Sequence, residues 1–442
     1  MSASPDRAAA AAFASSIDTL ILAALRAGTT DFAGLLRRLP SVYPTEVFRS
    51  LDRLTDRGLV SPGLAAGMRR EAGQRAATSP EGRSLLPLPH PLDYEWRFTP
   101  DASRTLLDLA ADLTPLGGNV LLFGTPGLAL EALSLPINRQ LFFLAEDNVV
   151  TKRVITLNRA TGSPLSIAFC SGGLPRDTAD AVLMDPPWYM DFIRPMLAAA
   201  AAACRKGGVV LISMPPIGTR SSAEQDRMST VRFAARLGLD VLEHRALAVA
   251  YDTPFFEANA LVAAGIHPPP RWRRGDLVVF HKARIESRDA PLTSGRRRDW
   301  IELTIGRMRL FIKRGDARTD TFAGLIHIVE GDVLPSVSRR DLRRRRALVW
   351  TSGHRIFSTD NPAVVLEAAT SYNGAEIGSG AQPGLWGNLR GAVERVGQQL
   401  VALAALEAEE ERGSLDIAPE RRAVWTSDSM SSYGRSMATV SG

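Results

Sequence analysis

The residues best suited to chemistry in this chain are the tetrapeptide Asp185-Pro186-Pro187-Trp188, which directly follows the apolar run 181–184. Each proline has a fixed φ and lacks an N–H group, so the carbonyls of Asp185 and Pro186 can face a cleft. The Asp185 carboxylate and a neighbouring carbonyl can then accept both hydrogens of an amino group, and Trp188 can stack on a flat base. The tetrapeptide predicts a site for a planar amine; the alternative is a proline-rich turn with a buried tryptophan.

A short glycine turn lies earlier in the chain and can contribute to the same site. Gly124-Thr125-Pro126-Gly127 follows the apolar run 120–123 and precedes a helical stretch. Strand, glycine turn and helix in this order place a ligand at the start of the helix. We therefore expect Gly124, Thr125 and Gly127 to bind a nucleoside cofactor, although a G-x-x-G turn is a weak signal on its own.

Two acidic residues follow the next apolar run. Glu146 and Asp147 come after residues 140–144. They lie close to the roughly 20-residue spacing from the glycine turn at which an acid reaches ribose hydroxyls in dinucleotide folds. Either carboxylate could bind a ribose, and the alternative is a solvated acidic turn.

These motifs need a sheet that brings several strand ends together. Between residues 100 and 285, apolar runs alternate with helical stretches. The expected strands cover residues 120–123, 140–144, 165–169, 181–184 and 209–213. Such alternation favours an α/β fold with a parallel sheet covered on both faces, whose ligands bind at the carboxyl ends of the strands. Segments 240–250 and 258–264 look like an antiparallel pair of strands, and 275–280 like an eighth strand or a return to the edge.

In this setting the tetrapeptide resembles the catalytic motif of class I S-adenosylmethionine-dependent amino-methyltransferases, which modify exocyclic nitrogens of adenine or cytosine, or a planar amide. The resemblance covers about residues 100–285. It implies a Rossmann-like methyltransferase domain and S-adenosyl-L-methionine as cofactor. It further implies methyl transfer to an exocyclic or amide nitrogen, with a nucleic-acid base as the preferred acceptor and the tetrapeptide in the catalytic role.

Two other interpretations remain open. The chain also resembles the branched-chain polyamine synthases, which join a winged helix to a Rossmann domain with a D-P-P-aromatic motif and transfer aminopropyl groups. Those enzymes carry acidic residues directly after the first-strand glycine, where this chain has Thr125 and Pro126. The third interpretation is a non-catalytic winged-helix regulator or scaffold with a nucleotide-binding Rossmann domain. It is favoured by the glycine turn, which is sparser than in most methyltransferases.

Residues 65–99 predict a linker followed by a cap segment. The linker, about residues 65–91, is rich in Gly, Ala, Ser and Pro, whereas residues 89–98 are dense in aromatic and charged side chains. Asp93, Tyr94 or Trp96 could lie near the ligand, and the alternative is an aromatic plug between domains. The aromatic residues expected to contact the acceptor are Tyr94, Tyr189, Phe255 and Phe256.

Residues 1–64 predict a winged-helix domain. Apolar residues at helical spacing indicate three short helices, and residues 58–60 would begin the wing. The third helix carries the basic residues Arg49, Arg53 and Arg57. In winged-helix domains this helix can enter the major groove of DNA. Asp52 and Asp56 interrupt the basic face, so dimerisation or docking on the catalytic domain is the alternative.

The segment 295–411 predicts a separate α+β domain. Residues 301–312 suggest a strand or a hairpin with Gly306 at its turn, and a long helix is expected from about residue 385 to 411. Arginine clusters at 296–298 and 343–346 could contact phosphates, although a solvated helix face is the commoner explanation for charge runs. The domain could also mediate a homodimer or bind a protein partner. Residues 412–442 are expected to be disordered.

Composition excludes several classes of protein. The 442 residues include 53 Lys and Arg and 47 Asp and Glu, a net charge of +6. Arginine greatly outnumbers lysine, so the basicity is weak evidence for a polyanionic partner. Two cysteines, Cys170 and Cys204, form neither a disulfide framework nor a zinc site. No P-loop, H-E-x-x-H or G-x-S-x-G motif is present, and no metal is expected. No apolar run reaches the length of about 18 residues that a membrane span needs, which predicts a cytoplasmic protein.

Overall fold

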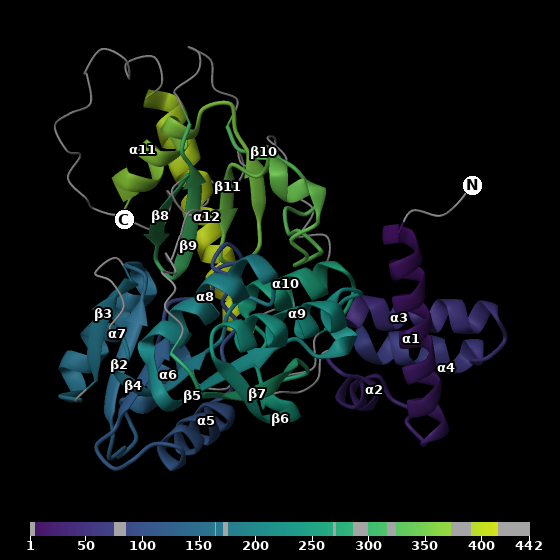
Figure 1. The fold of residues 1–442 in the computed structure, drawn as a ribbon. Coiled ribbons are helices and arrows are strands. Elements are labelled where there is room, and N and C mark those ends of the chain that lie inside the picture. The colour runs from purple at the N-terminus through teal and green to yellow at the C-terminus, as the bar shows by residue number, and fades with distance from the viewer. Residues whose placement is uncertain are drawn as a thin grey trace.

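The computed structural model describes residues 5–74, 85–163, 165–170, 176–267, 271–285, 299–315, 324–372 and 390–413. These residues form three parts, which are a group of N-terminal helices, a central sheet covered by helices, and a C-terminal α+β domain beside the central part (Figure 1). The expected disordered tail lies outside the described residues, apart from its first two positions.

The central sheet has seven strands in the order β3-β2-β1-β4-β5-β7-β6. The strands are β1 (Asn119–Phe123), β2 (Gln140–Ala145), β3 (Ser166–Phe169), β4 (Ala179–Met184), β5 (Cys204–Met214), β6 (Leu239–Ala250) and β7 (Arg274–Lys282). Strands β1 to β5 are parallel, and β7 runs antiparallel to both β5 and β6. The predicted Rossmann-like sheet of methyltransferase type is confirmed.

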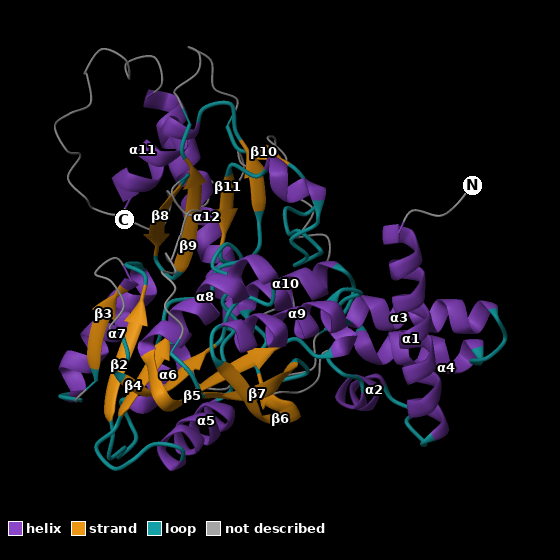
Figure 2. Ribbon diagram, in the orientation of Figure 1, coloured by secondary structure: helices purple, strands orange, loops and turns teal. Residues whose placement is uncertain are grey.

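Helices cover both faces of this sheet (Figure 2). They are α5 (Pro100–Asp112), α6 (Pro126–Ala132), α7 (Val149–Thr161), α8 (Met190–Ala203), α9 (Ala223–Arg236) and α10 (Phe255–Ala263). One apolar core packs α5, α6 and α7 on the sheet, and a second packs α8 and α9 on the other face. Strand β4 is buried along its whole length, and its sequence is apolar apart from Asp180, as expected of a strand covered on both faces.

One predicted strand is wrong. In the segment 258–264, expected to pair with β6, residues 258–263 belong to helix α10 and Ala264 is its C-cap. Strand β7 takes the place beside β6 instead. Pro254 is the N-cap residue, and the buried residues Phe256, Ala260 and Leu261 share one helical face. A short apolar run cannot be assigned to strand or helix by periodicity alone, and its alanines favour the helix.

The N-terminal part is a group of four helices, not a winged helix. Helices α1 (Pro5–Arg26), α2 (Phe32–Arg38) and α3 (Pro44–Asp56) correspond to the three predicted helices. After a turn at Gly58, where the wing was expected, the chain enters a fourth helix, α4 (Pro62–Ala72). Ser61 caps α4 by accepting a hydrogen bond from the Leu64 N–H, and Pro62 suits the first helical position.

The linker predicted from residue 65 is therefore wrong in its first part. Ala65, Met68 and Ala72 of α4 are buried in the core of the N-terminal helices. The Gly and Ala content suggested a linker, but these apolar residues recur at helical spacing and bury one face. Residues 75–84 lie outside the described part of the chain.

The basic residues of α3 are largely paired within the N-terminal helices. Arg53 lies 2.7 Å from the Asp18 carboxylate of α1, Arg57 lies 3.6 Å from the same carboxylate, and Arg49 pairs with Glu46. Arg53 and Arg57 thus link α3 to α1, and Arg49 pairs within α3. Little positive charge on α3 is left unpaired to contact a DNA groove.

Helix α1 corrects the expectation that no apolar segment is long enough to span a membrane. Residues Ala8–Arg26 have the length and a mean hydropathy, 1.8, that such a helix needs. Length and composition are weak evidence, because a core helix passes the same test. Ile17, Ile21 and Ala24 of α1 are buried in the core of the N-terminal helices.

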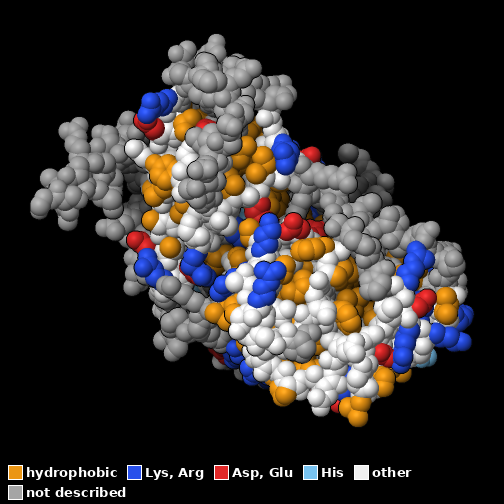
Figure 3. Space-filling model, turned by 90° about the vertical axis from the view of Figure 1, so that its left-hand side faces the viewer, with side chains coloured by type: hydrophobic (Ala, Val, Ile, Leu, Met, Phe, Trp, Pro, Cys, Tyr) orange, Lys and Arg blue, Asp and Glu red, His pale blue; other side chains and the backbone are white. Residues whose placement is uncertain are grey.

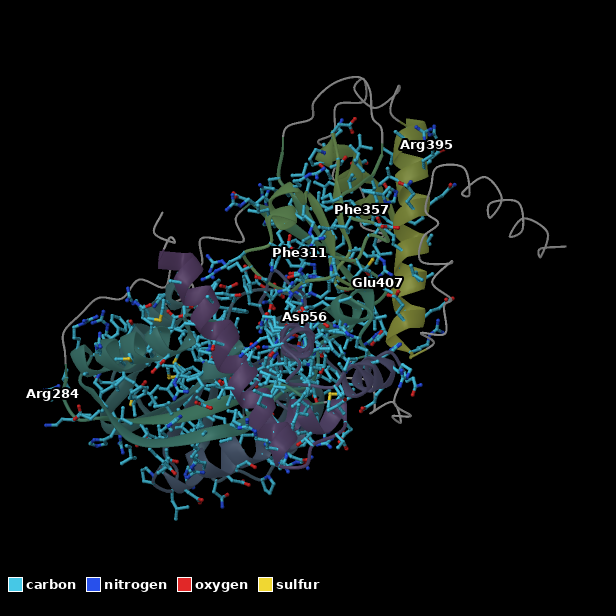
Figure 4. The ribbon with its side chains drawn as sticks, turned by 90° about the vertical axis from the view of Figure 1, so that its right-hand side faces the viewer. Asp56, Arg284, Phe311, Phe357, Arg395 and Glu407 are labelled. Atoms are coloured by element: carbon cyan, nitrogen blue, oxygen red, sulfur yellow. The ribbon has the colours of Figure 1, made fainter. Side chains whose placement is uncertain are left out.

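The C-terminal domain has a five-stranded sheet in the order β10-β12-β11-β9-β8. Its elements are β8 (Trp300–Ile305), β9 (Met308–Lys313), β10 (Ile326–His327), β11 (Val349–Thr351), β12 (Ile356–Ser358), α11 (Pro362–Tyr372) and α12 (Arg390–Glu411). The predicted hairpin at Gly306 is confirmed, since β8 and β9 pair antiparallel around it. Phe357, labelled in Figure 4, lies in the core that α11 and α12 share with this sheet.

Buried arginines join the C-terminal domain to the other parts. Arg309 of β9 is fully buried and lies 2.6 Å from the Asp93 carboxylate of the cap segment and 2.5 Å from Glu302. Arg355 pairs with Glu410 of α12 at 2.6 Å. Asn259 of α10 donates to the same Glu410 carboxylate at 3.1 Å. The sheet domain and the C-terminal domain are therefore held together by buried, charge-assisted contacts.

Candidate functional site

The sheet order places the two predicted motifs side by side. Strands β1 and β4 are neighbours, and Phe123 is in register with Met184. Gly124 and Asp185 therefore leave adjacent strands at the same rim. The strand order reverses between these two strands, and ligands of open α/β sheets bind in the crevice at such a switch point.

Asp185 lies at this rim, partly exposed but surrounded by protein. The Tyr251 hydroxyl donates a hydrogen bond of 2.7 Å to its carboxylate, and the Ser213 hydroxyl lies 2.5 Å from the Tyr251 oxygen. Burial raises the pKa of Asp185 from 3.8 to about 7, and the hydrogen bonds from Tyr251 and Ser213 oppose that rise. The carboxyl group is thus poised to gain or lose a proton near neutral pH.

The carbonyls of the tetrapeptide behave as the two prolines predict. The Tyr189 N–H donates to the Pro187 carbonyl at 2.6 Å. Among the described residues, no backbone N–H donates to the Asp185 or the Pro186 carbonyl. These two oxygens remain available to accept from an amine held beside the carboxylate.

Tyr251, Ser213 and Gly275 were missed by the sequence analysis. Tyr251 follows β6, Ser213 lies on β5 and Gly275 on β7, so their proximity depends on the insertion of β7 between the other two strands. A Cβ on Gly275 would lie 2.7 Å from the Ser213 hydroxyl and 3.1 Å from Cζ2 of Trp188. The close packing around Asp185 therefore requires glycine at this position.

A cavity of about 780 Å³ opens beside the tetrapeptide. All four residues, Asp185 to Trp188, line it together with aromatic side chains from other parts of the chain. These aromatic residues are Phe13, Tyr43, Tyr94, Trp96, Tyr189 and Tyr251. The volume falls within the range of small-molecule sites, and the rings offer flat surfaces for a planar ligand.

The cap segment contributes directly to this cavity. Tyr94 and Trp96 line it, whereas Asp93 pairs with the buried Arg309. The Trp96 indole donates to the Glu257 carboxylate at 3.0 Å. Phe98 forms a β-bridge with Tyr251. Two of the three candidate residues in this segment are therefore brought to the site.

The predicted aromatic contacts divide into two groups. Tyr94 and Tyr189 line the cavity, and their ring centroids lie 6.0 Å apart. Phe255 and Phe256 are not among its lining residues. Phe256 is fully buried and packs edge-to-face against Trp96, with ring centroids 5.2 Å apart. It supports a wall of the cavity from behind.

Arginines also line the cavity, at positions that the sequence did not single out for this site. They are Arg49, Arg220, Arg273, Arg340 and Arg343. The acidic lining residues are Glu46, Asp185 and Asp341. Arg273 lies over the rings of Trp96 and Trp188, 5.2 and 5.9 Å from their centroids, and pairs with the buried Glu257. The site thus combines aromatic and cationic surfaces.

The predicted cofactor residues lie along the same rim but outside the lining of this cavity. Gly124 has a φ of 65°, which glycine adopts without strain. The Thr125 hydroxyl is buried and has no hydrogen-bond partner in the described part of the chain. Gly127 faces the Arg97 side chain. A Cβ atom added at Gly127 would lie 3.6 Å from the Arg97 Cβ. A buried, unpartnered hydroxyl beside the turn fits a polar ligand there.

The two candidate ribose acids differ in their surroundings. Asp147 is exposed and lies 3.5 Å from the Lys152 ammonium. Glu146 directly follows β2 and is half-buried. Burial raises the pKa of Cys170 to about 11, and the nearby Glu146 adds to that rise. Glu146 is therefore the better placed of the two to bind a nucleoside.

No family model and no curated protein matches the chain. Solved structures are similar to it, among them a mutein of the branched-chain polyamine synthase from Thermus thermophilus. The two chains are 16% identical, the match covers 65% of this chain and 95% of the synthase chain, and the TM-score is 0.49. A putative RNA methyltransferase from Pyrococcus horikoshii has 19% identity over 44% of this chain and 91% of its own, with a TM-score of 0.33.

A putative sarcosine dimethylglycine methyltransferase from Galdieria sulphuraria has 15% identity over 42% of this chain and 85% of its own, with a TM-score of 0.31. At these identities and TM-scores no activity can be transferred to this chain. The fold assignment rests on the strand order and pairing described above.

Proposed function

We propose that this protein is an S-adenosylmethionine-dependent methyltransferase that acts on a planar amino or amide nitrogen, with a nucleic-acid base as the preferred acceptor. The observation that carries this proposal is the position of the tetrapeptide. Asp185 to Trp188 line an aromatic cavity at the switch point of the sheet. A carboxylate, two available carbonyls and a flat ring meet there, as the binding of a planar amine requires.

Each residue of the tetrapeptide has a distinct role in this proposal. The Asp185 carboxylate and the Pro186 carbonyl accept the two hydrogens of the amine, which directs the nitrogen lone pair toward the methyl group. Trp188 stacks on the ring that carries the amine. Holding the nitrogen in this orientation lowers the barrier through positioning and through electrostatic stabilisation of the charge that develops on nitrogen.

The residues of the glycine turn and of the β2 end would hold the cofactor. The Thr125 hydroxyl offers a polar contact, and the Glu146 carboxylate can accept hydrogen bonds from ribose hydroxyls. When bound, S-adenosylmethionine supplies a methyl group on a positively charged sulfur. As the new C–N bond forms and the S–C bond breaks, the nitrogen must release a proton, and Asp185 can accept it because its pKa lies at about 7.

Aminopropyl transfer to a polyamine is less well supported. A polyamine carries several positive charges. Four of the five arginines that line the cavity pair with carboxylates, and the fifth, Arg340, has no carboxylate within 4.0 Å among the described residues. Like charges at such close range disfavour binding of a polycation. The residues Thr125 and Pro126 that follow the first-strand glycine also lack the carboxylates of the polyamine synthases.

Calorimetry with S-adenosylmethionine, its decarboxylated analogue and S-adenosylhomocysteine tests this proposal. We expect binding of the first and third and weaker binding of the decarboxylated compound. Preference for the decarboxylated compound would favour aminopropyl transfer. If none of the three compounds binds, both enzyme proposals are excluded and a non-catalytic regulator or scaffold is the remaining interpretation.

Asp185→Ala tests the role of the tetrapeptide. In an assay with radiolabelled S-adenosylmethionine and mixed-sequence RNA and DNA oligonucleotides, we expect a loss of transfer of at least about 100-fold, since the variant removes both the hydrogen-bond acceptor and the base. Cofactor affinity should stay within about threefold, because the cofactor contacts lie elsewhere on the rim. Equal activity in the variant would exclude the tetrapeptide from the mechanism.

A further inference from the structure

The C-terminal domain forms part of the wall of the cavity. Its lining residues come from the segment that leads into the short 3-10 helix η3 (Leu342–Arg346). They are Pro335, Ser336, Val337, Ser338, Arg340, Asp341 and Arg343. We call this segment, residues 335–344, the arginine wall. The sequence analysis noted its arginine run but did not connect it to the tetrapeptide.

The arginines of the cavity differ in whether a carboxylate neutralises them. Arg220 lies 2.8 Å from Asp226, and Arg343 lies 2.7 Å from Asp341. Arg340 lines the cavity, is exposed, and has no carboxylate within 4.0 Å among the described residues. It is therefore a free cation facing the ligand space.

Arg344 lies one layer behind the cavity surface. Its guanidinium lies 5.6 Å from the ring centroid of Tyr94 and 4.7 Å from that of Trp350, and it donates to the Val337 carbonyl at 3.1 Å. Burial lowers the pKa of this guanidinium. In the part of the chain that the structure describes, no carboxylate lies within salt-bridge distance of it. A charge enclosed in this way is costly unless an opposite charge approaches.

Arg220 and Arg339 stack on an aromatic residue that lines the same cavity, Tyr189. Arg220 and Arg339 each lie 5.2 Å from the ring centroid of Tyr189. Arg339 also pairs with Asp191 at 2.8 Å. Alternation of guanidinium groups and aromatic rings is the pattern that binds a phosphate backbone and stacks its bases.

We propose that the arginine wall binds the phosphate of a single-stranded nucleic acid, with Arg340 and Arg343 as the phosphate ligands and the attached base directed toward Asp185. Guanidinium groups match the geometry of phosphate oxygens, and a cation without a carboxylate partner gains most from such a contact. The cavity, at about 780 Å³, has room for a nucleotide but not for a duplex. The direction of the base rests on the proposed methyl transfer, whereas phosphate binding does not.

The general basicity of the protein does not carry this inference. On the face shown in Figure 3, Lys and Arg side chains are spread among acidic and apolar ones. The argument depends on two cations at one cavity wall. A control variant that makes the same charge change on η3, outside the cavity lining, can therefore separate binding at the wall from general electrostatic attraction.

The test measures fluorescence anisotropy of labelled 12-nucleotide single-stranded RNA and DNA, without S-adenosylmethionine, over a range of salt concentrations. We expect the full-length protein to bind single strands. The logarithm of the binding constant should fall with the logarithm of the salt concentration, with a slope of about −0.7 per phosphate contact. Arg340→Glu should weaken binding by at least about tenfold and reduce that slope by roughly one contact. Arg345→Glu is the matched control, since Arg345 is exposed on the adjoining helix η3 and does not line the cavity.

Several outcomes would overturn the inference. Equal weakening by Arg340→Glu and Arg345→Glu would assign binding to the general basic surface. A mononucleotide that competes as well as the 12-mer would exclude a strand as the ligand, and preference for a hairpin duplex would contradict the cavity argument. Absence of strand binding with S-adenosylmethionine binding intact would remove the arginine wall but leave methyl transfer standing. The reverse result would remove methyl transfer alone.

Discussion

Asp185 lies where its ionised form lowers the folding stability of the protein. A carboxyl group with an ordinary pKa of 3.8 is held where burial raises the pKa to about 7. Burial favours the neutral carboxyl group. The contribution of Asp185 to folding stability is therefore fully present below the ordinary pKa of 3.8 and is lost as the pH rises through about 7. A carboxylate kept at this cost suggests a functional reason, since sites that need a strained or charged group commonly trade stability for it.

We therefore predict that Asp185→Asn stabilises the protein in a pH-dependent way. Asparagine carries no charge at any pH and keeps an oxygen that can accept from Tyr251. At pH 8 the variant should be more stable than the wild type by about 2–4 kcal/mol, whereas near pH 4 the two should be equal. Urea unfolding at the two pH values measures the difference. A constant difference at both values would contradict the raised pKa.

Tyr251 also acts at the residue scale. Its hydroxyl links Ser213 to Asp185, so it orients the carboxylate that would hold the amine. Burial raises the pKa of Tyr251 well above its ordinary value of 10.0, and the nearby Asp185 adds to the rise. Tyr251 therefore remains protonated and acts as a donor to the carboxylate throughout the physiological pH range.

At the scale of elements, the site depends on the reversed strand β7. Its insertion between β5 and β6 places Gly275 against Ser213, Tyr251 and Trp188. No side chain fits there without displacing them. Directly after β6, Tyr251 forms a β-bridge with Phe98 of the cap segment. Strands β6 and β7 therefore position both Asp185 and the aromatic residues of the cap segment that line the cavity.

Gly275→Ala should accordingly destabilise the protein by about 1–3 kcal/mol, because the added methyl group overpacks the site. It should also shift tryptophan fluorescence, since Trp188 must move. Gly63→Ala is the matched control. A Cβ on Gly63 of α4 would meet nothing within 4 Å, and alanine there should be neutral or stabilising. Equal thermal melting of the two variants would exclude close packing at Gly275.

At the scale of the whole molecule, the cavity is assembled from all three parts of the chain. Tyr43 comes from the N-terminal helices, Trp188 from the sheet domain and Arg340 from the C-terminal domain. Buried contacts such as the one between Arg309 and Asp93 hold the cap segment and the C-terminal domain in this arrangement. Loss of these contacts should therefore affect the site from a distance.

We predict that Arg309→Met costs about 3–5 kcal/mol of folding stability, because it leaves the Asp93 and Glu302 carboxylates buried without a cation. It should also increase proteolysis of the cap segment. Arg307→Met, on the same hairpin, is the control. The pair between Arg307 and Glu411 lies at the surface, so its loss should cost less than about 1 kcal/mol. Similar losses in thermal unfolding would contradict the anchoring role of Arg309.

The sequence by itself predicted the five parallel strands of the central sheet and the position of the tetrapeptide at the end of one of them. Continuous apolar runs such as 181–184 predict strands buried on both faces, and Asp185-Pro186-Pro187-Trp188 had to lie where one of them ends. The hairpin at Gly306 was equally predictable, because the turn and the flanking apolar residues are local. These features depend on neighbours in the chain, which a single sequence displays.

Only the tertiary structure decided which distant residues complete the site. Residues 258–264 have a composition that fits a strand or a helix, and packing selected helix α10. A fourth helix, α4, stands where a wing was expected, because its buried face finds partners in the other N-terminal helices. Tyr251 reaches Asp185 through strand pairing, and Arg340 reaches the cavity through domain packing. Contacts between residues this far apart leave no periodic signal in one sequence, so no local pattern could have revealed them.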